Sequence, residues 1–251
     1  MIDLTPSCPP YEGEFLRVIS GSTLSGLSVI DSDRDETGIF IEPREYITGL
    51  KTIEQHQWRS KPQGEPSGKG DADVTVYGLQ KWMRLATKGN PNVHLVLFAP
   101  SELRIIDSKM ANDLRSIAPL IVSKRAAGQY LGYLTAQRQR LLGERGGRRV
   151  QRPLNDEGYD AKYACHMIRL GFQGIELMTT GQLTLPMQGK EREYCMQIRR
   201  GELSLDEVLI KCAELEQELA DLKTSSPLRD EPDYTAINDF LHNVYTTTWD
   251  K

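Results

Sequence analysis

Two aspartates one residue apart, Asp33 and Asp35, have the spacing in this chain that most clearly suggests chemistry. Residues two apart in a β-strand point to the same face, so in an extended segment these two carboxylates would lie side by side. Adjacent carboxylates repel each other and favour a bound cation. Hard oxygen ligands suit Mg²⁺, which is usually held by one or two carboxylates together with substrate phosphates. The pair therefore predicts a metal site that acts on phosphates.

Gly21 and Ser22 lie upstream of the acid pair and strengthen this interpretation. An isolated pair of acids is more often an ordinary acidic turn. A glycine, however, allows a tight turn with exposed backbone N–H groups, and a serine adds a hydroxyl, so the two together can hold phosphate oxygens. Glycine, hydroxyl and paired acids predict a single site for phosphate and metal.

The order of these residues resembles the signature of nucleotidyltransferases of the DNA polymerase beta superfamily, which is glycine-serine followed by two acids one residue apart. The resemblance implies a third acid on a later strand. Asp73 fits this place because it opens an alternating segment, 73–77, and Asp71, on the same face, is the alternative. The resemblance also implies two Mg²⁺ ions, with Mn²⁺ as a substitute, and an NTP such as ATP as substrate.

Further segments resemble a branch of predicted nucleotidyltransferases, some of them associated with RNA repair. They are 21–41, 73–77 leading into 88–92, and 162–170. One departure from the superfamily pattern is Arg34, which stands between the two acids where many members have an apolar residue. Its side must therefore be partly open, or the arginine must be paired.

A helical stripe and an arginine-rich segment are the candidate contacts for the nucleotide and for RNA. Lys162, His166 and Arg169 have the spacing of one helix face; the resemblance favours contact with the triphosphate or an acceptor, and the alternative is a solvated basic stripe with His166 partly buried. The segment 138–152 contains six arginines and only one acid, Glu144. This excess of positive charge is typical of polyanion binding, and a flexible solvated loop is the alternative. The arginines predicted to contact RNA are Arg145, Arg148 and Arg149.

The surrounding pattern predicts an α+β fold. Strands are expected at 15–19 and at 73–77, and a further strand is expected to end at 38–41. A turn is expected at 21–26 and an exposed loop at 55–70. Helical periodicity follows from Leu79 to Gly89 and at 109–118, 120–142, 159–180 and 205–223, with a short helix within 230–251. We expect a catalytic domain at 1–100 and a helical domain at 101–251 that closes the cleft.

Composition excludes several classes of protein. With 251 residues, 39% of them hydrophobic, the chain is neither collagen-like nor disordered, and no apolar run is long enough to cross a bilayer. Its four cysteines are far apart, which predicts packing residues rather than a zinc site or disulfides, and a cytoplasmic protein without a signal peptide. The net charge of −4 means that any RNA binding must come from a local basic patch.

The predicted reaction is transfer of a nucleoside monophosphate from an NTP to an acceptor hydroxyl with release of pyrophosphate. An RNA 3′ end, such as that of tRNA, is the favoured acceptor, because the arginine-rich segment and the repair association agree. The alternatives are nucleotidylation of a protein or small molecule, and a catalytically silent module that binds nucleotide or RNA. Three acids at the signature spacing argue against the silent module, since binding alone needs no metal pair.

Overall fold

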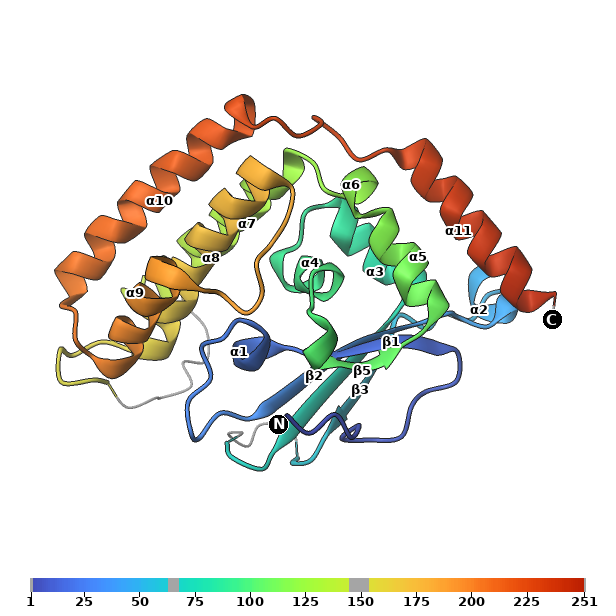
Figure 1. The fold of residues 1–251 in the computed structure, drawn as a ribbon, viewed down its shortest axis with the longest axis horizontal. Helices are drawn as coiled ribbons and strands as arrows, with labels where there is room; N and C mark the ends of the chain where they lie inside the picture. Colours follow the sequence, from blue (N-terminus) through green and yellow to red (C-terminus); the bar gives the residue numbers. More distant parts are fainter. Residues whose placement is uncertain (1, 63–67, 145–153, 251) are drawn as a thin grey trace. The chain divides into compact units, whose positions relative to one another are not determined.

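The computed structural model describes residues 2–62, 68–144 and 154–250, which form two compact units (Figure 1). The first, the sheet unit, comprises residues 1–87, 92–121 and 232–251. The second, the helical unit, comprises residues 88–91 and 122–231. Residues 101–121 and 232–251, which the sequence assigned to the helical domain, thus group with the sheet. Closure of a cleft by the helical domain stays a prediction.

The sheet unit is built on a mixed five-stranded sheet with the order β3-β4-β2-β1-β5. β2 and β4 are parallel neighbours, while the other pairs are antiparallel. The three predicted strands are present and the α+β class is confirmed. The expected loop at 55–70 is wrong at its start, because residues 55–59 form an edge strand against β4. The strands are β1 (Glu14–Ile19), β2 (Arg34–Phe40), β3 (Gln55–Arg59), β4 (Ala72–Gly78) and β5 (Arg104–Asp107).

Alternation along the strands gives the sheet two different faces. The front face, from which Asp35 projects, also carries Leu16 and Ile39, both fully buried. The helices α3 (Leu79–Thr87) and α5 (Lys109–Ser116) contact this sheet. The short helix α4 (Pro91–Leu97) follows α3 in the chain. Trp82 of α3 is fully buried, so it is a core residue.

The back face is covered by the segment that precedes β1. Cys8 of this segment packs with Phe40, Val74 and Val76, and Tyr11 lies against the same cluster. Valines at alternate positions of β4 thus point to the back face, and the polar residues between them point to the front face. The sheet has a hydrophobic core on both sides, and the polar positions that remain at its edge are available for a site.

The last helix of the chain returns to the sheet unit. In α11 (Tyr234–Trp249), the Tyr245 hydroxyl donates to Glu42 Oε2 at 2.6 Å, and Trp249 Nε1 donates to the Glu42 carbonyl at 3.0 Å. The Glu42 carboxylate also accepts the backbone N–H groups of Leu79 and Gln80. Burial raises the pKa of Glu42, and these hydrogen bonds oppose the rise. The helical unit is therefore an insertion between two segments of the sheet unit.

The helical unit packs around α8 (Ala161–Thr180), which contacts α7 (Arg125–Leu141), α9 (Gly189–Arg200) and α10 (Leu205–Ser225). Gly171 permits close approach of α10, since a Cβ there would lie 2.7 Å from Leu215 Cδ1. A capping box begins α10, with Ser204 and Glu207 bonded reciprocally. The single helix predicted at 120–142 is interrupted: α6 ends at Ile121 and α7 begins at Arg125. The helix α9 was not predicted.

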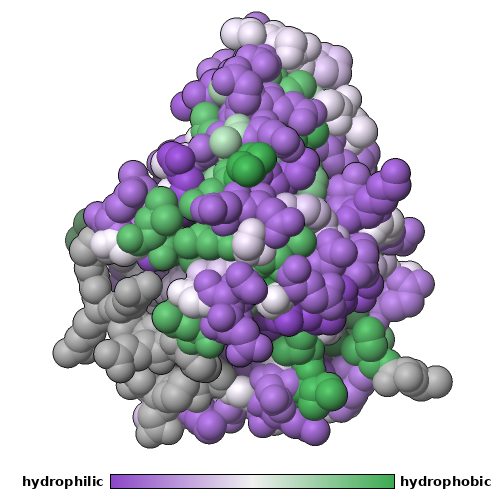
Figure 2. All heavy atoms as spheres, turned by 90° about the vertical axis from the view of Figure 1, so that its left-hand side faces the viewer, coloured by the Kyte–Doolittle hydropathy of each residue, from purple (hydrophilic) through white to green (hydrophobic). Residues whose placement is uncertain are grey.

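The surface and the remaining short elements complete the fold. The side of the molecule shown in Figure 2 is largely hydrophilic, with a band of hydrophobic side chains between the hydrophilic ones. The short elements are α1 (Gly21–Leu24), α2 (Arg44–Thr48), α6 (Ala118–Ile121) and a 3₁₀ turn at Ser101–Leu103. Throughout the described ranges, no helix combines the length and the apolar character that a membrane span requires.

Candidate active site

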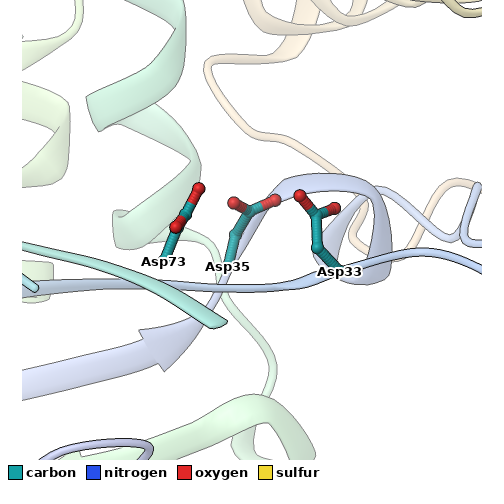
Figure 3. Close-up of side chains that lie close together, drawn as sticks. All are labelled: Asp33, Asp35 and Asp73. Atoms are coloured by element: carbon teal, nitrogen blue, oxygen red, sulfur yellow. The ribbon is translucent and has the colours of Figure 1, made fainter. Parts of the chain in front are cut away.

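Three carboxylates meet on the front face of the sheet, at one end of β2 and β4. The parallel register places Asp35 directly beside Asp73, and Asp33, two residues before Asp35, lies on the same side. One carboxylate oxygen from each residue lies within 4.8 Å of the other two. Figure 3 shows the three side chains projecting together, with Asp35 between its neighbours. The structure thus brings together the three acids that the sequence singled out.

The chemistry of this acidic cluster fits Mg²⁺ or Mn²⁺. All three donors are carboxylates, and all three residues are half-buried. Oxygens this close can share ions that bind at about 2.1 Å after small side-chain adjustments. Without a cation, three like charges at this separation would repel each other. The arrangement is therefore suited to one or two divalent ions held between protein carboxylates and substrate phosphates.

Arg59 is a residue of the site that the sequence analysis missed. It is the register partner of Asp73 on β3, and its guanidinium holds the carboxylate with two bonds, from Nε to Oδ1 at 2.7 Å and from a terminal nitrogen to Oδ2 at 3.1 Å. This hydrogen bonding raises the pKa of Arg59. A signal was present, since Arg59 and Lys61 stand at mirror positions to Asp73 and Asp71 about the intervening loop. Opposite charges in such register indicate an antiparallel hairpin.

Asp71, the alternative third acid, has a different environment. Its carboxylate accepts the backbone N–H of Gly68 at 2.8 Å and pairs with Lys61 Nζ at 2.8 Å. The hydrogen bond from Lys61 is the main cause that lowers the pKa of Asp71. Asp71 is not among the acids that cluster with Asp33 and Asp35. The third acid of the cluster is Asp73.

Gly21 and Ser22 begin α1 directly against the acidic cluster. The Ser20 backbone N–H donates to the Asp35 carbonyl at 2.8 Å, and the Thr37 hydroxyl donates to the Ser20 hydroxyl at 2.9 Å. A Cβ at Gly21, where φ is +59°, would lie 1.9 Å from Asp35 Oδ2. Only glycine fits this approach. The first turn of a helix leaves its backbone N–H groups without partners inside the helix. At the start of α1 these groups lie near the cluster, because Gly21 lies against Asp35, and they can bind an anion.

Arg34, between Asp33 and Asp35, is paired, one of the two outcomes that its position predicted. It points to the back face, where Nε donates to Glu36 Oε1 at 2.8 Å and its terminal nitrogens donate to the carbonyls of Asp3 and Thr5 at 2.7 Å each. The arginine therefore anchors the segment that covers the back face, and it does not neutralise the acidic cluster.

A fully buried ion-pair network lies under the same strand. Arg17 pairs with Glu14 at 2.6 Å and with Glu36 at 3.3 Å, and it donates to the Cys8 carbonyl at 2.9 Å. The side chains of Arg17, Glu14 and Glu36 have no solvent exposure. Burial disfavours the charged form of Arg17, but its bonds to Glu14 outweigh this effect and raise its pKa. This network is structural, and it explains how two acids can be buried next to the site.

Within the helical unit, Lys162, His166 and Arg169 form the stripe on α8 that their spacing predicted. Arg169 donates to His166 Nδ1 at 3.2 Å and to Gln173 Oε1 at 3.2 Å. Loss of solvent, followed by the nearby charges of Arg169, Arg140 and Lys162, lowers the pKa of His166 to about 3. His166 is thus neutral at pH 7 and accepts a hydrogen bond amid cations. Contact of this stripe with a nucleotide stays a prediction.

The predicted RNA contacts Arg145, Arg148 and Arg149 lie outside the described residues. Arg138, at the start of the same arginine-rich stretch, belongs to α7 and lies 3.4 Å from Glu216 of α10. All four cysteines are buried and free, as expected for packing residues.

A comparison with protein families gives a match that covers most of the chain. A model of the RNA repair pathway DNA polymerase beta family (RlaP) matches residues 15–243, a range that includes the cluster. Among solved structures, the chain is similar to a nucleotidyltransferase-like protein from Exiguobacterium sibiricum 255-15, with 11% sequence identity, a TM-score of 0.29, and coverage of 94% of this chain and 75% of that chain. A search of curated proteins finds no match.

Proposed function

Because the chain belongs to the RNA repair pathway DNA polymerase beta family, a membership that implies nucleotidyl transfer, we propose that it is a metal-dependent nucleotidyltransferase acting on an RNA 3′ end. The proposed reaction transfers a nucleoside monophosphate from an NTP to the terminal hydroxyl, and pyrophosphate leaves. One observation carries the proposal: Asp33, Asp35 and Asp73 present carboxylate oxygens within 4.8 Å of one another. A protein that only bound RNA would have no use for this concentration of negative charge.

Each residue of the site has a role in this reaction. The acceptor oxygen attacks the α-phosphorus, the bond to the pyrophosphate oxygen breaks, and the acceptor proton must leave. Asp33 and Asp35 would hold divalent ions, which stabilise the negative charge that develops on the phosphate oxygens. Asp73 is the candidate to orient the acceptor hydroxyl and receive its proton. The N–H groups at Gly21 and Ser22 would hold phosphate oxygens.

Two groups of basic residues would act on the remaining negative charge of the substrates. Lys162, His166 and Arg169 are assigned to the triphosphate, where Lys162 and Arg169 would supply positive charge beside the neutral His166. The assignment of Arg145, Arg148 and Arg149 to the RNA backbone is supported by the local excess of arginine. Neutralising these three arginines together should reduce the dependence of log K on log salt by about 2 units for single-stranded RNA, measured by fluorescence anisotropy. An unchanged salt dependence would remove them from the RNA site.

The test of the function separates the acceptors. The protein is incubated with each α-³²P-labelled NTP, Mg²⁺ or Mn²⁺, and total RNA, in parallel with the same RNA oxidised by periodate at its 3′ terminal diol. Label should enter only the untreated RNA, should require a divalent ion, and should be absent with Asp35→Asn. Equal labelling of oxidised RNA, or label that moves with protein, would refute the RNA 3′ end as acceptor. Labelled protein would favour protein nucleotidylation instead.

A further inference from the structure

Arg59 occupies the outer edge of the acidic cluster. β3 is an edge strand, and its last residue is the register partner of Asp73 on β4. Both carboxylate oxygens of Asp73 accept hydrogen bonds from the guanidinium, at 2.7 and 3.1 Å. The two side chains are 32% and 31% exposed, so the pair is open to solvent and to ions.

This geometry gives Arg59 two opposing effects on the cluster. A guanidinium that grips both oxygens fixes the plane of the carboxylate, which a single charge on a flexible stem would not do. The same guanidinium brings a positive charge to the place where a divalent ion would bind, and like charges repel. Arg59 should therefore improve the alignment of Asp73 while weakening metal binding.

We propose that Arg59 is a positioning residue that aligns Asp73 and sets the metal concentration at which the acidic cluster fills. The catalytic half of this proposal rests on the proposed function, whereas the metal half concerns the cluster alone. In its catalytic half, Arg59 acts through Asp73: it keeps the carboxylate directed toward the acceptor side of the site.

The neighbouring pair Lys61 and Asp71 supplies a matched control. Like the pair of Arg59 and Asp73, it joins a cation before the loop to an aspartate after it, with Nζ and Oδ2 2.8 Å apart. Asp71 lies outside the acidic cluster, so Lys61 has no carboxylate of the cluster to align. If Arg59 only fastened the edge of the sheet, the two cations would be equivalent.

The experiment compares Arg59→Gln, Arg59→Lys and Lys61→Gln in the full chain. Binding of Mn²⁺ without nucleotide is measured from the free-ion signal in electron paramagnetic resonance, and kcat and KM for NTP are measured in the transfer reaction. Arg59→Gln should bind Mn²⁺ about three- to tenfold more tightly, since one repelling charge is gone. It should lower kcat about 10- to 100-fold with little change in KM. Arg59→Lys should retain the repulsion and lose part of kcat, and Lys61→Gln should resemble the wild type.

A second comparison confines the effect to Asp73. In Asp73→Asn, adding Arg59→Gln should change Mn²⁺ affinity much less than it does in the wild type, because the carboxylate through which Arg59 is held is gone. Equal Mn²⁺ affinities in Arg59→Gln, Lys61→Gln and wild type would overturn the proposal, even if transfer occurs. Weaker Mn²⁺ binding in Arg59→Gln would also overturn it. The expected Mn²⁺ shift without transfer to any acceptor would instead refute the proposed function and leave the metal half standing.

Discussion

Asp35 and Glu36 are neighbours on β2, and the two faces of the sheet treat their charges in opposite ways. Asp35 is half-exposed and lies among two further acids, Asp33 and Asp73. Glu36 is 1% exposed and is paired with Arg17 and Arg34. A shift of one residue along an extended chain thus separates an acid in a concentrated negative cluster from an acid neutralised by the protein itself.

The comparison shows how an acid in the proposed metal site differs from an acid that the protein itself neutralises. On the back face, Glu14 and Glu36 have arginines at bonding distance, because an unpaired charge would be too costly to bury. On the front face, three carboxylates lie close together, and Arg59 pairs with one of them, Asp73, at the edge of the cluster. The front face keeps an excess of negative charge, which a divalent ion can neutralise when substrate is bound.

The largest effect should follow removal of the front-face charge. Asp35→Asn keeps the shape of the side chain but loses the charge that binds metal, so transfer should fall at least about 10⁴-fold, roughly 5 kcal/mol in activation free energy. The free energy of unfolding should not fall, since a repulsion among acids is relieved. Activity assays and urea denaturation measure the two quantities. A destabilised but active variant would contradict the division between the faces.

The next largest effect should follow removal of the back-face cation. Arg17→Met leaves Glu14 and Glu36 buried beside an apolar group, which should lower the free energy of unfolding by about 3–5 kcal/mol. Urea denaturation monitored by circular dichroism measures this loss. At low temperature, where the variant stays folded, Mn²⁺ affinity should remain within about twofold of the wild type. A variant of unchanged stability would show that the network is not structural.

A smaller effect is expected at Arg34, which lies between Asp33 and Asp35 in the sequence but points to the back face. Arg34→Gln removes hydrogen bonds to Glu36 and to the carbonyls of Asp3 and Thr5, at a cost of about 1–3 kcal/mol in unfolding free energy. Its Mn²⁺ affinity should stay close to that of the wild type, unlike that of Arg59→Gln. Limited proteolysis should cleave the segment before β1 faster. Tighter Mn²⁺ binding in this variant would mean that the affinity depends on the total positive charge nearby and not on the face of the sheet to which the arginine points.

The smallest effect on the reaction is expected at Asp71. Asp71→Asn should leave kcat within about threefold of the wild type, because its carboxylate binds Lys61 and Gly68 outside the acidic cluster. Its lowered pKa has a consequence for stability: the Asp71 contribution is present above the unfolded pKa and is lost as pH falls through the folded value. The variant should therefore lose less stability than the wild type as the pH falls below about 4, the ordinary pKa of an aspartate. Steady-state kinetics and acid-dependent melting test the two statements, and a large loss of kcat would return Asp71 to the site.

The sequence predicted the parts of the fold whose residues repeat with a clear period. The apolar runs at 15–19 and 38–41 and the alternating valines of β4 indicated three strands. The glycine-serine before the acid pair, and the family resemblance that it carried, indicated the three acids of the cluster. β3 was missed because Gln55, His56 and Gln57 show no apolar alternation, and an edge strand needs little of it. Arg59 was missed for the same reason, since its role depends on pairing with β4.

Long-range contacts were the other part that local patterns could not provide. The helix near the C-terminus was predicted from its apolar face, but a face does not identify the surface that it covers. The bond from Tyr245 to Glu42, far apart in sequence, is what places α11 with the sheet. Likewise, nothing in the spacing of Arg17 and Glu36 indicates that they pair within the sheet.

The insertion of the helical unit into the sheet unit also has a consequence for the order in which the protein is made. A ribosome adds about 5–20 residues per second and releases the chain from its N-terminus. The five strands emerge early, then the whole of 122–231, and only afterwards the helix that supplies Tyr245 and Trp249 to Glu42. During that interval the buried carboxylate of Glu42 lacks its hydroxyl partner. The sheet unit can therefore reach its final stability only after translation has passed α11, and a nascent chain arrested before α11 should be more sensitive to protease near Glu42 than the released protein.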